Sequence, residues 1–290
     1  MNSPAPKAAP TAGLKLSAPV VPRLAATTLI VRDGATGLEV LMVRRSLQAS
    51  FMPGAYVFPG GAVDAADASH DHPSLCDESA QELARRVGAV TDVGDQALAF
   101  AVAALRECFE ECGLWLGAPD HHAPEGGGFE ALRARLHAGE SLATLVAASG
   151  TRLITSGLQP WSRWVTPVGL PKRFDTLFFV ARTPVGQVPE VDAGETTTLA
   201  WVNPPTALEM REKGEFPMEF ATVSIVESLR PFATAQALLD NAAAQTRLPA
   251  IHPRMKVDAE GRMRGVLLPG QAGYDQAHGA DLSPAAGAAG

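Results

Sequence analysis

Three glutamates crowd one short stretch of the sequence, ALRECFEECGL at residues 104–114. Glu107, Glu110 and Glu111 stand three and four positions apart, so on a helix with about 100° per residue they fall within an arc of roughly 100°. Like charges at these spacings repel by roughly 0.2–0.5 kcal/mol per pair, and carboxylates in a last helical turn also face the negative end of the helix dipole. Most charged helix faces are simply solvated, but solvation does not explain why this repulsion is retained.

A divalent cation would turn the repulsion into attraction, because hard cations such as Mg²⁺ take oxygen ligands and favour clustered carboxylates. The residue types therefore predict a metal site on this helix face. Zinc is disfavoured, because Cys108 and Cys112 fall on the apolar side of the same helix and no histidine is near in sequence. Both cysteines are expected to be buried thiols.

The helix that carries these residues is expected to run from about Asp95, as its N-cap, to Cys112, with Gly113 as its C-terminal stop. Its apolar stripe is rich in small side chains, which would allow the helix to lie close to a sheet. The stripe consists of Ala97, Ala101, Ala104, Leu105, Cys108 and Cys112.

A second segment that could take part in the chemistry is FPGGAVDAAD at residues 58–67. Two adjacent glycines after a strand let a backbone carbonyl approach a metal or a phosphate closely, although alone they fit any tight turn. Together with the glutamate helix this segment resembles the Nudix box. The residues that match the box are Gly61, Asp67, Arg106, Glu107, Glu110, Glu111 and Gly113. Asp67 stands where most members have Glu, and thirty-eight residues separate it from Arg106 where seven are usual, so an insertion splits the box.

The resemblance implies an α/β/α Nudix sandwich and hydrolysis of a nucleoside diphosphate linked to another moiety. It implies Mg²⁺ or Mn²⁺ as cofactor, which would orient the diphosphate and lower the pKa of the attacking water. Glu110 and Glu111 would be the principal ligands, and the Gly61 carbonyl and Glu107 further ones.

The water-activating base is left open between two glutamates. Glu107 is one candidate, and Glu195 in DAGET is the other, although a plain solvent-facing acid is favoured for Glu195. Arg106 is expected to orient the neighbouring carboxylates rather than to touch the substrate, because arginine forms fixed bidentate hydrogen bonds with carboxylates.

The segment RRSLQASFMPGAYVFPGGAVDAAD resembles that of coenzyme A diphosphatases, which share the Arg-Ser pair and the Gly-Gly-x-x-Asp-x-x-Asp run. The insertion in the box and PKRFDTLFF at 171–179 are most similar to the peroxisomal, Nudix motif nineteen type of coenzyme A and acyl-coenzyme A diphosphatases. This resemblance implies cleavage to 3′,5′-ADP and 4′-phosphopantetheine or its acyl form. Arg45, Lys172 and Arg173 are candidates for binding substrate phosphates, against the alternative of ordinary surface cations.

Two other functions stay open. A diphosphatase for ADP-ribose, NADH or a related dinucleotide would use the same box, which fixes the chemistry and not the leaving group. A non-catalytic Nudix-fold module that binds a nucleotide or regulates another protein belongs to a different class, and loss of box glutamates would indicate it. None of the box glutamates is lost.

Composition excludes several classes of partner. A net charge of −7 argues against a broad nucleic-acid or anionic-membrane surface, and no segment approaches the roughly 20 apolar residues of a membrane span. Only three cysteines occur, without a paired framework, which suits a reducing compartment. We expect a cytoplasmic protein with a small-molecule substrate, since no peroxisomal tripeptide ends the sequence; the oligomeric state is left open.

The elements mix strands and helices without regular alternation, which indicates an α/β or α+β fold around one mixed sheet. A single domain is expected over 23–270, with insertions at about 68–94 and 117–150 and loosely ordered ends at 1–22 and 271–290. Strands are expected at 24–32, 38–45, 163–167, 173–183 and 196–202 and in a last hairpin at 254–268. Further helices are expected at 80–87, 131–139, 141–149, 204–212 and 220–241, the last kinked or restarted at Pro231.

Overall fold

The computed structural model describes residues 16–48, 52–69, 72–116, 128–191 and 196–278. The chain separates into two compact units. The larger one contains Leu24–Arg163 and Thr176–Pro249, and the smaller one contains the described parts of Met1–Arg23, Trp164–Asp175 and Ala250–Gly290. The expected division into one domain over 23–270 with loose ends stays a prediction.

A mixed sheet forms the centre of the larger unit, with strand order β3-β2-β1-β6-β5. Strand β4 pairs with β1 and β7 pairs with β2, both antiparallel. Arg23 donates to the Arg173 carbonyl before β6, and Thr183 after β6 donates to the Val31 carbonyl, so β1 and β6 run in the same direction. The strands are β1 (Arg23–Gly34), β2 (Gly37–Arg45), β3 (Tyr56–Val57), β4 (Gly60–Ala62), β5 (Gln159–Val165), β6 (Phe174–Arg182) and β7 (Thr196–Val202).

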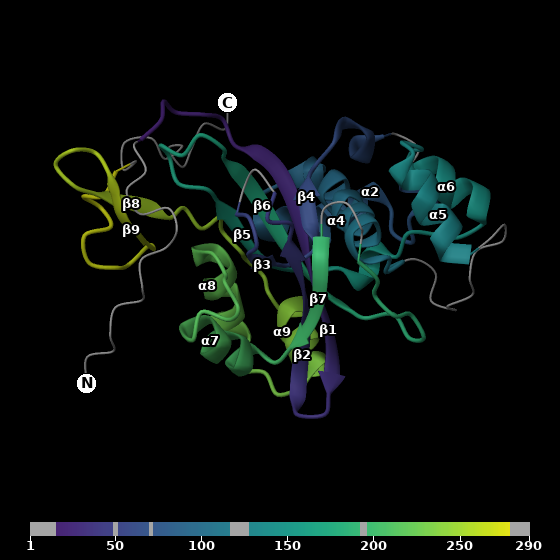
Figure 1. Cartoon of the computed structure of the whole chain (residues 1–290). Coiled ribbons are helices and arrows are strands. Elements are labelled where there is room, and N and C mark those ends of the chain that lie inside the picture. The colour runs from purple at the N-terminus through teal and green to yellow at the C-terminus, as the bar shows by residue number, and fades with distance from the viewer. Residues whose placement is uncertain (1–15, 49–51, 70–71, 117–127, 192–195, 279–290) are drawn as a thin grey trace. The chain divides into compact units, whose positions relative to one another are not determined.

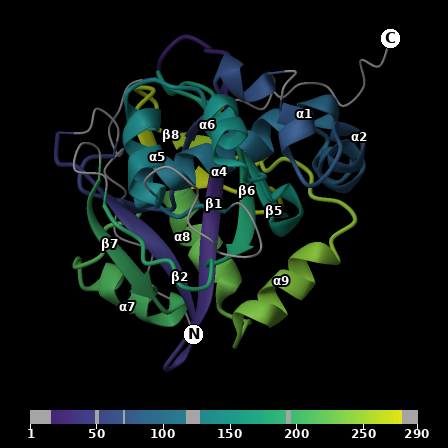
Figure 2. The ribbon, with the colours of Figure 1, turned by 90° about the vertical axis from the view of Figure 1, so that its right-hand side faces the viewer.

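Helices cover both faces of this sheet (Figures 1 and 2). Ile30, Leu41 and Phe179 pack in one core cluster with helix α4 (Ala97–Cys112). Neighbours along the strands, such as Val31 and Val180, are equally buried and point to the opposite face, because side chains alternate along a strand. On that face lie helices α7 (Pro204–Glu212), α8 (Phe220–Leu229) and α9 (Ala235–Ala243), and the expected α/β/α sandwich is confirmed.

Helix α4 ends as expected at Gly113, whose φ of 67° is the left-handed conformation that glycine adopts readily. Its beginning was predicted wrongly. Asp95 lies in a 3₁₀ turn, Gly94–Gln96, and Gln96 occupies the N-cap position without a side-chain hydrogen bond. The alanine stripe brings the helix close to the sheet, where the Thr28 hydroxyl donates to the Ala104 carbonyl at 3.3 Å.

The insertion that splits the box folds as short helices on the same core. It contains α1 (His72–Leu75), α2 (Ala80–Leu83), a π-helical turn over Ala84–Gly88 and α3 (Ala89–Thr91). Arg86 anchors it, through bonds of 2.7 Å and 2.8 Å to the Glu78 carboxylate and 2.7 Å to the Leu158 carbonyl. The second insertion contributes α5 (Gly128–His137) and α6 (Leu142–Ser149).

The helical segment expected over 220–241 is two helices with a turn between them. Helix α8 ends at Leu229, and α9 begins at Ala235 after Thr234, whose hydroxyl accepts from Ala237 N at 3.2 Å. Pro231 therefore lies in the turn, and the prediction that it kinks or opens a helix is wrong. Among the described helices none alone is long and apolar enough to cross a membrane; Ala80–Thr91 with Gly94–Cys112, bent by 116°, meets the length and composition criteria only as a pair.

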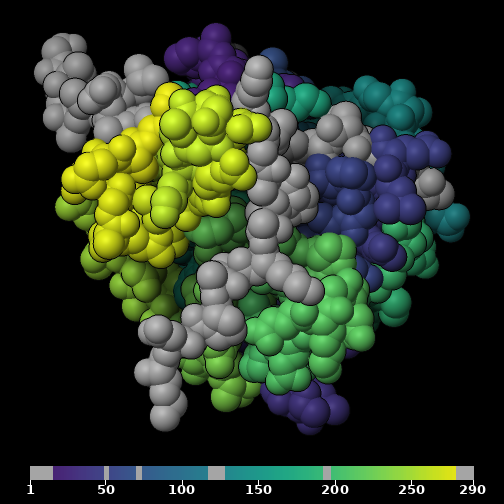
Figure 3. Space-filling view, turned by 60° about the vertical axis from the view of Figure 1, so that its left-hand side comes forward, coloured from purple at the N-terminus to yellow at the C-terminus, as the bar shows by residue number. Residues whose placement is uncertain are grey.

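The smaller unit contains a hairpin of β8 (Arg254–Val257) and β9 (Met263–Leu267), within the yellow part of Figure 3. The chain after the hairpin is hydrogen-bonded to it. The Tyr274 hydroxyl donates to the His252 carbonyl at 2.6 Å, and His278 N donates to the Met255 carbonyl at 3.0 Å. The described residues after the hairpin are thus held to it by backbone and side-chain hydrogen bonds.

Candidate active site

The Gly-Gly loop meets the carboxylate helix directly. Strand β4 pairs Gly60 with Thr27 and Gly61 with Ala26, which places the loop beside α4. The Gly60 N–H donates to Glu111 Oε2 at 2.9 Å. A Cβ added at Gly61 would lie 2.3 Å from Glu107 Oε1, so the carboxylate would have to move to admit any other residue. Two of the three glutamates are therefore in contact with the loop, as the resemblance required.

Arg106 is the centre of the cluster, and its side chain is only 10% exposed. Its Nε and Nη2 donate to the two Asp67 oxygens at 2.9 Å each, and Nη2 also donates to the Ala62 carbonyl at 3.0 Å. Nη1 donates to Glu107 at 2.9 Å and to Glu110 at 3.2 Å. One guanidinium thus fixes two glutamates and ties them to the end of the Gly-Gly segment.

Asp67 completes the first half of the box from within a turn. Residues AADA form the 3₁₀ helix Ala65–Ala68, with Asp64 at its N-cap, and Asp67 Oδ2 accepts from Asp64 N at 2.8 Å. The side chain of Asp67 is 2% exposed and paired with Arg106. Asp67 therefore occupies the position of the usual Glu. The two halves of the box remain in contact although the insertion separates them in the sequence.

Arg133 is a member of this site that the sequence reasoning missed. It lies on α5, in the second insertion, and its Nε and Nη2 donate to the Glu110 carbonyl at 3.0 and 2.7 Å. A cation at a helix C-terminus offsets the negative end of the helix dipole, which the glutamates make more negative. Arg133 carries no signal in the sequence, because nothing in its neighbourhood identifies the carbonyl that it binds.

Burial shapes the charge of the glutamates. The pKa of Glu107 is raised to about 7, chiefly by burial, with Arg106 opposing the rise and Glu110 adding to it. Burial also raises the pKa of Glu110. Both shifts arise chiefly because burial removes water from the charged carboxylate, and Arg106 opposes them.

The donor set suits a hard divalent cation, since it consists of carboxylate oxygens and the Gly61 carbonyl. As the described side chains lie, however, no three His, Cys, Asp or Glu side chains converge on one point. Glu107 and Glu110 turn oxygens to Arg106, and Glu111 turns one to the Gly60 N–H. A cation would have to compete for these oxygens, and which glutamates hold it stays a prediction.

The predicted phosphate-binding residues lie in different places. Arg45 ends β2, is half-buried, and its N–H donates to the Ala55 carbonyl in the segment that leads to the Gly-Gly loop. Lys172 and Arg173 belong to the smaller unit, where the Arg173 side chain donates to the Thr166 and Val20 carbonyls at 2.9 and 2.6 Å. Glu195, the alternative base, lies outside the described residues.

Comparisons with known proteins find relatives of one family. The family model for the NUDT19 Nudix domain matches residues 11–221. The acyl-coenzyme A diphosphatase NUDT19 of Gallus gallus is 29% identical over 71% of this chain and 67% of its own length. That of Homo sapiens is 31% identical over 60% of this chain and 56% of its own length.

A solved structure agrees at the level of the fold. The crystal structure of a Nudix hydrolase from Alicyclobacillus acidocaldarius is 30% identical, with a TM-score of 0.63 over 76% of this chain and 96% of the other. The match extends over most of that chain, so this chain shares the fold of that Nudix hydrolase.

Proposed function

The chain belongs to the NUDT19 Nudix domain family, and from that premise we propose that it hydrolyses the diphosphate bond of coenzyme A or acyl-coenzyme A. The products would be 3′,5′-ADP and 4′-phosphopantetheine or its acyl form. The observation that carries the proposal is the contact between the two halves of the Nudix box. Gly60 binds Glu111 and Arg106 binds Asp67, although the insertion separates these residues in the sequence. The names of the chicken and human relatives support the choice of substrate.

Mg²⁺ or Mn²⁺ is the proposed cofactor, held by Glu110 and Glu111 with the Gly61 carbonyl and Glu107 as further ligands. A divalent cation at this place neutralises diphosphate charge and makes bound water more acidic. Arg106 keeps Glu107 and Glu110 from separating, through bonds of 2.9 and 3.2 Å. Gly61 leaves room for the Glu107 carboxylate, which a side chain at this position would overlap.

Glu107 is also a proposed base for the attacking water, with Glu195 as the alternative. Glu107 is held on one side by Arg106 and on the other by contact with Gly61, so its carboxylate has a fixed position. A general base must lie within hydrogen-bond reach of the proton that it takes, and a fixed carboxylate meets that condition. Arg45, Lys172 and Arg173 are proposed to bind the substrate phosphates.

One assay tests the substrate. The purified protein is incubated with Mg²⁺ or Mn²⁺ and, separately, coenzyme A, acetyl-coenzyme A, ADP-ribose and NADH, and the products are identified by mass. We expect 3′,5′-ADP from the two coenzyme A substrates. If AMP appears from ADP-ribose or NADH and no 3′,5′-ADP from coenzyme A, the dinucleotide alternative replaces the proposal; no product from any substrate would favour the non-catalytic module.

Glu110→Gln and Glu111→Gln test the ligand assignment. Both changes keep the shape of the side chain and remove its charge, so turnover should be lost while the fold is retained, as circular dichroism can show. A variant that keeps full activity would remove that residue from the proposed ligands. Each is compared with Glu209→Gln, a box-independent glutamate on α7.

We also propose that the protein works in a reducing compartment such as the cytoplasm. Cys76, Cys108 and Cys112 are free and buried, and a chain that relies on oxidising conditions would be expected to pair its thiols. Fractionation of cells that produce the tagged protein would locate it.

A further inference from the structure

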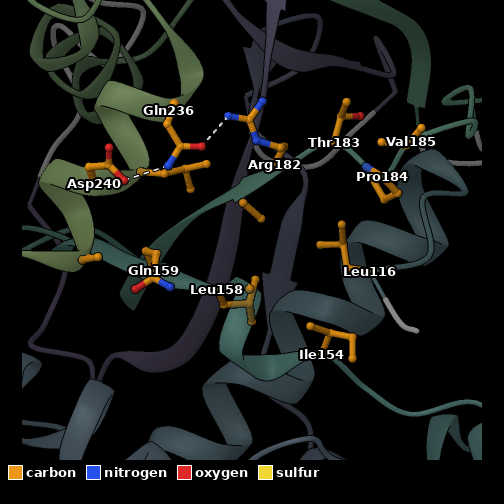
Figure 4. A pocket seen from close by; sticks show the side chains of 14 residues that line it. Leu116, Ile154, Leu158, Gln159, Arg182, Thr183, Pro184, Val185, Gln236 and Asp240 are labelled. Carbon is orange, nitrogen blue, oxygen red and sulfur yellow. Dashed lines mark hydrogen bonds between the residues drawn. The ribbon is translucent and has the colours of Figure 1, made fainter. Parts of the chain in front are cut away.

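A cavity of about 500 Å³ lies in the larger unit, away from the carboxylate cluster. It is bounded by the end of β6, the start of β5, helix α9 and Leu116 (Figure 4). Its size falls within the range of roughly 300–1,000 Å³ typical of small-molecule sites. Leu116, Ile154 and Leu158 line one side, and Arg182, Gln236 and Asp240 lie across from them.

Three polar side chains of the cavity are paired with one another, whereas the Thr183 hydroxyl, which also lines it, is buried and has no hydrogen-bond partner among the described residues. Arg182 Nη2 donates to Gln236 Oε1 at 3.0 Å, and Gln236 Nε2 donates to Asp240 Oδ1 at 2.7 Å. Arg182 also lies 3.6 Å from the Asp33 carboxylate, so its charge is balanced. The cavity therefore offers an apolar wall of Leu116, Ile154 and Leu158, and its one cation is already paired with Asp33, which suits an apolar chain better than an anionic ligand.

The distance from the candidate active site matches one part of the proposed substrate. Strand β4 pairs with β1 as far as Thr27, and Thr183, which lines the cavity, bonds to Val31, four residues further along β1 or about 13 Å. The pantetheine arm between phosphate and sulfur has about as many chain atoms as four extended residues, which span about 14 Å. A diphosphate at the Gly-Gly loop could thus place the thioester near the cavity.

A described loop connects the two places. It leaves the cavity at Val185, passes Gln187, whose amide bonds the Trp115 backbone at 2.8 and 3.0 Å, and reaches Glu190, whose N–H donates to the Cys112 carbonyl at 2.9 Å. Cys112 follows Glu111 in the sequence. Val185 and Val188 on this loop are 70% and 78% exposed, so apolar surface continues from the cavity toward the carboxylate helix.

We infer that this cavity binds the acyl chain of an acyl-coenzyme A substrate, with the pantetheine arm along the loop 183–190. The inference rests on the proposed function, because it takes the substrate from there. It adds a site that determines specificity: the cavity would favour medium and long acyl chains over free coenzyme A through burial of apolar surface.

Binding tests the inference without turnover. The affinities of 4′-phosphopantetheine and S-dodecanoyl-4′-phosphopantetheine are measured by calorimetry in EDTA. The dodecanoyl form should bind at least about tenfold more tightly, because even two buried methylenes supply that factor. Ala243→Trp, on the exposed side of α9 at the cavity, should reduce this gain to about threefold or less, whereas Ala237→Trp, exposed on the same helix and outside the cavity lining, should keep it.

Val185→Asp is a second variant, for the case that the tryptophan disturbs α9. The aspartate places a charge on the cavity wall from an exposed loop. It should lower the affinity for the dodecanoyl form and leave the affinity for 4′-phosphopantetheine less changed. Equal affinities for the two ligands in the unaltered protein, or a full gain in both cavity variants, would overturn the inference. Failure of the proposed function looks different: no 3′,5′-ADP from coenzyme A or dodecanoyl-coenzyme A, whatever the binding result.

Discussion

Arg106 binds Asp67 through two parallel hydrogen bonds of 2.9 Å, although the two residues are 39 positions apart in the sequence. Both side chains are almost fully buried, at 10% and 2% exposed. The remaining donors of Arg106 reach Glu107 and Glu110, so the pair also sets the position of the carboxylate cluster. The geometry of the candidate site therefore depends on an interaction that bridges an inserted subdomain.

Asp67→Ala should be strongly destabilising, because it leaves a buried guanidinium without its bidentate partner. Loss of one member of a buried ion pair typically costs about 3–5 kcal/mol. Urea unfolding of the two proteins measures the difference. Asp64→Ala is the matched control: Asp64 is 61% exposed and 3.9 Å from Arg106, so about 1 kcal/mol or less is expected. Similar losses in the two variants would mean that the buried pair is not what holds the box together.

Gly61→Ala should reduce activity far more than stability. Its methyl group would lie 2.3 Å from Glu107 Oε1, so the carboxylate or the loop must move by about an ångström. Displacements of that size near reacting groups cost on the order of 100-fold in rate. Steady-state kinetics with the best substrate of the assay measures the loss. Gly265→Ala, where no atom lies within 4 Å of the new methyl group, is the control and should behave like the unaltered protein.

Much of the fold could be predicted because local signals agreed with it. Gly113 ends α4, and the turn at Gly34–Gly37 falls between the strands expected at 24–32 and 38–45. The family resemblance supplied the sandwich and the meeting of Gly61 with the glutamates. Asp95 was chosen as N-cap because acids are favoured there, but it lies inside a 3₁₀ turn, one residue before Gln96, which occupies the N-cap position. The prediction that Pro231 kinks or opens a helix failed because the next helix starts three residues later, where the Thr234 hydroxyl caps it.

What the sequence could not give is pairing between distant segments. Arg133 binds the Glu110 carbonyl from an insertion, and Arg86 fixes the first insertion to residues near 155–158. Neither contact leaves a periodic or spacing pattern, since any exposed arginine would look the same. The acyl cavity is also invisible in the sequence, because its lining comes from several separated segments.

The stability of the metal-free protein should fall as the pH rises from about 4.5 to about 7. Burial raises the pKa of Glu107 from 4.5 to about 7, so the folded protein binds a proton there more tightly than the unfolded chain. The stabilisation is complete below 4.5 and is lost as the pH rises through 7, and it amounts to at most about 3 kcal/mol. Urea unfolding in EDTA at several pH values measures this slope.

Glu107→Gln is the matched variant for the pH experiment. It removes the titrating carboxylate and keeps its shape, so the fall between 4.5 and 7 should become shallower. Added Mg²⁺ should stabilise the unaltered protein at pH 7.5 by binding to the folded state, and should stabilise the variant less. An unchanged slope in the variant would show that another group causes the dependence.

The three thiols should be almost unreactive in the folded protein. Burial raises the pKa of Cys76 to about 12, with Asp77 and Glu78 adding to the rise, so almost no thiolate exists there at pH 8. The hydrogen bond with Cys108 and burial raise the pKa of Cys112 well above its usual value.

Because the thiolate is the reactive form and the sulfurs are covered, labelling by a disulfide reagent at pH 8 must wait for opening of the structure. We expect slow labelling of the native protein and three equivalents at once in denaturant. Leu47→Cys is the control, since Leu47 is 76% exposed and its replacement should react immediately in the native state. Fast reaction of any natural cysteine would contradict the packing of α4 or of the first insertion, and mass spectrometry of the labelled peptide would say which.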